Sequence, residues 1–157
     1  MFTMIAGIPA HPLFVHGSVV LIPLTALLGI LWALVPRFRT LLRWPTMIGV
    51  AVSVIALILT RTTGEALVPV NEPGIHEAYA NAFTVATGLM VLLLIALAVM
   101  LGRDMWAKTW GVVVRWLVAV SAVAVLVTSV LAGHSGAQLV WKDEAARIEA
   151  VLETSAS

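Results

Sequence analysis

The chain has 157 residues, of which 61% are hydrophobic and only 11% are charged. A soluble domain of this size cannot hide so much apolar surface from water, so the composition indicates an integral membrane protein with the lipid bilayer as its partner. The formal net charge of +1 gives no reason to expect nucleic acid binding. Cysteine is absent, which excludes disulfides, thiolate metal sites, cysteine-ligated iron–sulfur clusters and covalently attached c-type haem.

Four apolar blocks are long enough to cross about 30 Å of hydrocarbon at about 1.5 Å per residue. They cover approximately residues 12–35, 45–63, 74–101 and 112–141. The intervening segments are too short for another domain, so residues 1–141 are expected to form a single four-span domain. Residues 142–157 are a polar C-terminal tail, expected to form a short surface helix. The predicted fold is an all-α, integral membrane, antiparallel four-helix bundle.

The basic residues predict how this bundle is oriented. Six of the nine lie in the connections after the first and third spans: Arg37, Arg39, Arg43, Arg103, Lys108 and Arg115. The positive-inside rule makes that side cytoplasmic, so both termini are expected outside the bacterial cytoplasmic (inner) membrane. The same boundary is expected to carry an interfacial belt formed by Trp44, Trp106, Trp110 and Trp116, with Trp141 marking the outer boundary.

All four histidines are predicted to lie in the outer half of the bundle. His11 and His16 open the first span in "AHPLFVHG", His76 opens the third in "GIHEAYAN", and His134 lies near the end of the fourth in "AGHSGA". The positive end of the helix dipole disfavours a charged imidazole at His76. A neutral imidazole keeps the lone pair that a metal ion or haem iron requires.

Other polar residues are expected at the same level. Arg61 and Glu65 are one helical turn apart and close enough to pair. Glu77, Asn81 and Gln138 complete the group, and the cytoplasmic half of the bundle has nothing comparable.

Several neighbouring residues would make room for a flat cofactor. Pro23 falls on the face of His16 and should kink the first span. Gly133 and Gly136 flank His134 and permit close approach. On the third span, small and aromatic residues share one stripe: His76, Ala80, Phe83 and Thr87.

Each polar residue also has a structural interpretation. His16, His76 and His134 could be hydrogen-bonded residues that hold the helices together. His11, which precedes a proline, could be an interfacial group, and the Arg61–Glu65 pair could simply stabilise the end of the second span.

The motifs "HPLFVH", "HEAYAN" and "GHSGAQLVW" resemble those of the small bacterial membrane proteins grouped as domain of unknown function 2231. The resemblance extends from Pro9 to Trp141 and includes the four-span layout. It implies a likeness to b-type cytochromes and a role in electron transfer, since related domains occur beside cytochrome c or Rieske modules. The chain departs from the common pattern at Gly17 and Ser18, where relatives usually have an aromatic residue and a proline.

The leading hypothesis is a membrane protein that binds haem b in the outer half of the bundle and transfers electrons, alone or as a subunit of a redox complex. His16 and His76 are the expected axial pair, with His134 as the substitute for either. Arg61 would neutralise a propionate, and Gln138 could hydrogen-bond a ligand or water. A protein redox partner or larger membrane complex is implied.

Two alternatives remain open. The first is a copper or zinc site built from His11, His16, His76 and His134, with Glu65 or Glu77 as further ligands. The second is a structural or assembly subunit without a cofactor. An electron carrier or redox subunit is favoured over a free-standing enzyme, because the chain has no HExxH, Walker or Rossmann fingerprint.

Overall fold

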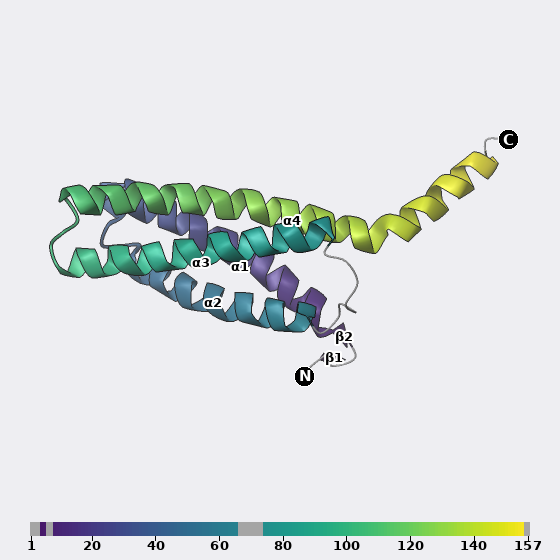
Figure 1. Ribbon diagram of the computed structural model, residues 1–157, viewed down its shortest axis with the longest axis horizontal. Helices are drawn as coiled ribbons and strands as arrows, with labels where there is room; N and C mark the ends of the chain where they lie inside the picture. The colour runs from purple at the N-terminus through teal and green to yellow at the C-terminus, as the bar shows by residue number, and fades with distance from the viewer. Residues whose placement is uncertain (1–3, 6–7, 66–73, 156–157) are drawn as a thin grey trace.

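The protein is described by a computed structural model, which covers residues 4–5, 8–65 and 74–155. Four helices dominate it: α1 (Ala10–Leu34), α2 (Arg43–Glu65), α3 (Ile75–Gly102) and α4 (Thr109–Ser155). A short 3-10 helix, η1 (Pro36–Phe38), follows α1, and the strands β1 (Met4–Ile5) and β2 (Ile8–Pro9) form a small antiparallel pair before it. All four helices are long and apolar enough to cross a membrane. The all-α four-helix bundle predicted from the sequence is therefore confirmed (Figure 1).

The helices alternate in direction, so the connections collect at two ends. The α1–α2 and α3–α4 connections lie at one end, here called the basic end, while the N-terminus and the start of α3 lie at the other, the histidine end (Figure 1). Beyond Trp141, α4 continues to Ser155 and projects from the histidine end instead of forming a separate helix. At about 1.5 Å per residue, α4 is about 70 Å long.

The four helices do not contact one another equally. α1 packs along both α2 and α4, and α3 packs along α4, whereas α2 and α3 meet over a short stretch and α1 and α3 are diagonal. The most apolar window of α2 is only 11% buried, against 33–39% for the other three spans. The second span is therefore the one with most of its surface left for lipid or for a partner protein.

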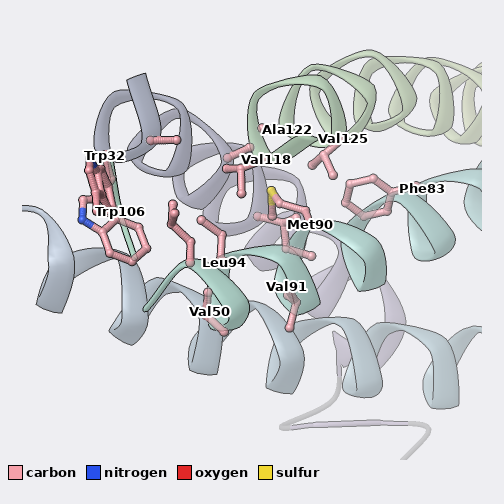
Figure 2. Close-up of a cluster of buried hydrophobic side chains, with 14 residues drawn as sticks. Trp32, Val50, Phe83, Met90, Val91, Leu94, Trp106, Val118, Ala122 and Val125 are labelled. Atoms are coloured by element: carbon pink, nitrogen blue, oxygen red, sulfur yellow. The ribbon is translucent and has the colours of Figure 1, made fainter. Parts of the chain in front are cut away.

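The core runs along the bundle axis where α1, α3 and α4 meet. Its largest fully buried side chains include Trp32, Met90 and Leu94, and Figure 2 shows these packed between the helices with Phe83, Val118 and Val125. α1 continues as a helix through Pro23. A span that is apolar on every side has no amphipathic pattern, so its sequence does not indicate which face is buried. Packing against the other helices determines that face.

Small polar residues join α1 to α2. Ser18 is 2% exposed; its hydroxyl donates to the carbonyl of Ala56 at 3.1 Å and lies 2.6 Å from the Thr60 hydroxyl. Hydrogen bonds of this kind stabilise helix pairs where water cannot compete for the groups. Ser18 therefore ties α1 to α2.

A second contact lies two turns deeper. The Ser53 hydroxyl donates to Thr25 at 3.0 Å, and Thr25 donates to the carbonyl of Leu21 at 2.9 Å. Gly49 lies beside them, and a Cβ placed there would be 2.7 Å from the Thr25 hydroxyl. The absence of a side chain at this position therefore lets the two helices approach closely.

The basic end contains an aromatic pair, Trp32 and Trp106. Trp44, Trp110 and Trp116 are 61–69% exposed, as an interfacial belt requires, but Trp106 is only 5% exposed. Its ring lies 5.9 Å from that of Trp32 (Figure 2). The prediction that Trp106 belongs to the belt is therefore wrong, because the α3–α4 connection folds it back against the core.

Two backbone features hold that connection in place. Asp104 adopts a left-handed conformation with φ 53°, which Asp tolerates better than most residues. Gly111, in the first turn of α4, lies so close to the connection that a Cβ there would be 2.3 Å from the carbonyl oxygen of Met105 and 2.5 Å from that of Trp106. Only glycine fits at this position without moving the backbone.

Candidate functional site

Hydrogen bonds between neighbouring helices mark one common level at the histidine end. Ser18 of α1 bonds to Thr60 of α2, and Arg61 of α2 donates to the Oδ1 atom of Asn81 on α3 at 2.5 Å. His76 of α3 in turn contacts Ser135 of α4. Of the polar residues predicted to share a level, Arg61, Asn81 and His76 take part in these bonds.

His76 is the histidine that the fold holds most firmly. Its side chain is half-buried in the first turn of α3, with Nδ1 3.0 Å from the hydroxyl oxygen of Ser135. That hydroxyl donates its own hydrogen to the carbonyl of Ala132 at 3.1 Å. When the hydroxyl hydrogen is used in this way, Ser135 can accept a hydrogen bond from a protonated Nδ1 of His76. In that tautomer Nε2 keeps its lone pair, which is the form that binds a metal or haem iron.

Gly136 positions the same imidazole from one side. A Cβ on Gly136 would lie 3.0 Å from Cε1 and 3.4 Å from Nδ1 of His76. The ring therefore rests against bare backbone of α4, and a side chain at this position would have to displace it. Gly136, predicted to make room near His134, makes room for His76 instead.

The other described histidines face outward. His134 is exposed, because Ser135 points at α3 and neighbouring residues on a helix are turned by about 100°. His16, on the second turn of α1, is also exposed on the bundle surface. Within the described part of the chain, no group of three or more His, Cys, Asp or Glu side chains is placed to hold a metal ion.

Several predicted site residues lie away from His76 or outside the described side chains. Gln138 is exposed on α4. His11 and Glu65 fall within α1 and α2, but their side chains lie outside the described part of the structure, so the predicted Arg61–Glu65 pair does too. The cross-helix bond from Arg61 to Asn81 is the interaction that helix periodicity could not reveal, because it joins residues of two different spans.

The predicted stripe on α3 points into the core. Phe83 and Thr87 are 8% and 0% exposed. The Thr87 hydroxyl has no hydrogen-bond partner among the described residues. Ser135, the residue that orients His76, was not singled out from the sequence; the only signal for it was its place beside His134 in "GHSGA".

Fold and site together define a multi-pass membrane protein of four helices, with a histidine held between two helices near one end. The chain belongs to the family described as predicted membrane protein DUF2231, whose sequence profile matches residues 7–148. The resemblance inferred from the histidine motifs is thereby confirmed. No curated protein and no solved structure matches the chain.

Proposed function

We propose that this protein binds haem b at the histidine end of the bundle and transfers electrons, alone or as a subunit of a membrane redox complex. The observation that carries the proposal is the contact of His76 with Ser135: Nδ1 lies 3.0 Å from the hydroxyl oxygen, so the proposed ligand atom is Nε2. Histidine ligands commonly have their second ring nitrogen held in this way, which fixes both the tautomer and the orientation of the ring.

The residues around His76 suit a haem group. Ser135 holds Nδ1 by a hydrogen bond, and the ring rests against the backbone at Gly136. Arg61, held by Asn81, brings a positive charge to the same level for a propionate carboxylate. Haem, when bound, supplies reversible one-electron transfer at its iron. The contribution of the chain is to offer the ligand atom, balance the charge and exclude water.

The second axial ligand is proposed to be His16 or His134. Both are exposed on the isolated bundle, at the same end as His76. α1 and α3, which carry His16 and His76, are diagonal in the bundle, while His134 precedes Ser135 on α4. Gln138, one turn beyond His134, would hydrogen-bond a ligand or water.

The test of this function is an absorption spectrum of the detergent-purified chain, produced with ample haem supply, before and after dithionite. A Soret band that shifts on reduction, with sharp α and β bands and about one iron per chain, is the result expected for a low-spin b-type haem. Metal analysis of the same sample separates the alternatives. Stoichiometric copper or zinc without a chromophore would favour the metal site. Neither haem nor metal would favour a structural subunit.

The proposed orientation places both termini outside the cytoplasmic membrane and the basic end inside. The native chain has no cysteine, so single cysteines can be introduced at exposed positions near either end, at Lys142 and Thr40. In intact spheroplasts, a membrane-impermeant maleimide is expected to label Lys142→Cys. It should label Thr40→Cys only after the membrane is permeabilised. The reverse pattern would overturn the orientation.

A further inference from the structure

At the basic end, one arginine from the α1–α2 connection and one from α4 lie against the same aromatic ring. The guanidinium carbon of Arg39, from the α1–α2 connection, lies 5.1 Å from the centre of the Trp106 ring. That of Arg115, from α4, lies 5.4 Å from the same centre. We call Arg39, Arg115 and Trp106 the arginine platform. Both cations therefore lie against one ring at the basic end.

Core contacts position the Trp106 ring and the backbone of Arg39. Trp106 is buried and packs on Trp32, whose indole nitrogen donates to the backbone carbonyl of Arg39 at 2.9 Å. The backbone that carries Arg39 and the ring beneath it are therefore fixed by the same core residue. A preorganised pair of guanidinium groups loses less conformational entropy on binding than two free side chains would.

The charge on the platform is not balanced by protein carboxylates. Asp104 is the only acidic residue among residues 1–64 and 78–142, and its side chain is exposed. The Nε atom of Arg115 is buried and has no hydrogen-bond partner among the described residues. A buried N–H without an acceptor is costly, so the Arg115 guanidinium is left with unsatisfied hydrogen-bonding capacity.

The depth of the platform indicates what that anion is. Trp44, Trp110 and Trp116 are exposed at the same end of the bundle, and exposed tryptophans of membrane spans lie at the level of the lipid headgroups. Clustered basic side chains between membrane helices bind anionic headgroups, and guanidinium groups match phosphate oxygens in geometry.

We infer that the arginine platform binds the phosphate of an anionic phospholipid in the adjacent leaflet. The lipid phosphate accepts hydrogen bonds from the guanidinium groups of Arg39 and Arg115. This inference does not depend on the proposed haem site, which lies at the opposite end of the bundle, and it holds for either orientation of the chain in the membrane.

The test is native mass spectrometry of the full-length, detergent-solubilised chain mixed with phosphatidylglycerol or, separately, phosphatidylcholine. The unchanged chain should retain phosphatidylglycerol in preference to phosphatidylcholine. Arg39→Gln and Arg115→Gln should each lower that retention by about fivefold. Arg103→Gln is the matched control, because Arg103 is exposed at the same end and lies outside the platform; it should retain the lipid as the unchanged chain does.

Three results would overturn the inference. Equal retention of the two lipids would show that the headgroup charge is not recognised, and an equal loss in Arg103→Gln would reduce the effect to general attraction. Displacement of the lipid by inorganic phosphate, but not by sodium chloride of equal ionic strength, would assign the platform to a soluble anion. Should a glutamine variant aggregate, Arg39→Lys and Arg115→Lys keep the charge but lose the planar fork. Their retention should fall below that of the unchanged chain, and unchanged retention would count against the inference.

Discussion

Haem is expected to be lost, with its reduced α and β bands, when His76 is replaced by alanine. The substitution removes the imidazole that is hydrogen-bonded to Ser135 between α3 and α4. Ser135→Ala should keep the ligand but no longer orient its ring, so the affinity for haem should fall by about 10–100-fold. The measurement is a haem titration of each purified variant, followed by its oxidised and reduced spectra. Ile75→Ala, at the exposed neighbouring residue, is the control and should match the unchanged chain.

The same titration identifies the second axial ligand, which is proposed to be His16 or His134. One of His16→Ala and His134→Ala should convert the haem to a high-spin or weakly bound form, while the other leaves it unchanged. A His76→Ala variant that keeps the low-spin spectrum would refute the ligand assignment. Loss of haem in both the His16 and His134 variants, with folding intact by circular dichroism, would mean that the two outer histidines act together.

Gly111→Ala is expected to destabilise the protein more than alanine at any other glycine whose surroundings the structure describes. The new Cβ would overlap the carbonyl oxygens of Met105 and Trp106, at 2.3 Å and 2.5 Å. These are backbone atoms, so relief requires the α3–α4 connection to move and to withdraw Trp106 from its place beside Trp32. Overpacking of this kind costs about 1–3 kcal/mol, and the lost contacts of Trp106 add to it.

Thermal unfolding in detergent, followed by circular dichroism, checks this expectation. The midpoint should fall by about 5–10 °C in Gly111→Ala. Gly88→Ala is the matched control, because a Cβ at Gly88 meets nothing within 4 Å and alanine favours the helix. It should leave the midpoint unchanged or raise it. Equal midpoints for the two variants would mean that the connection at Gly111 is free to shift, and that Trp106 is not held by it.

The spans were predictable because a membrane helix is a property of local composition. The blocks at 12–35, 45–63 and 74–101 agree with α1, α2 and α3 to within a few residues. The block at 112–141 agrees with α4 at its start, although the helix continues to Ser155. In hydrocarbon every backbone amide must bond within its own segment, so about 20 consecutive apolar residues are enough to specify a helix. Alternating direction then places both termini at one end without any tertiary information.

The site was predictable only in part. Its level in the bundle followed from the positions of His16, His76 and His134 along their spans. The sequence did not reveal three contacts of the site. Ser135 bonds to His76, Gly136 rather than Gly133 lies against its ring, and Arg61 bonds to Asn81. These contacts depend on the rotation of each helix about its axis, which spans apolar on all sides do not reveal.

By itself, then, the sequence determined a membrane protein of four antiparallel helices, with histidines gathered toward one end and arginines at the other. Tertiary structure alone decided which of those residues meet. Trp106 shows the difference most clearly, since its sequence position matches an interfacial belt while its side chain is buried against Trp32 under two arginines. The reason is physical: helix formation depends on neighbours along the chain, whereas burial depends on contacts between helices that are distant in sequence.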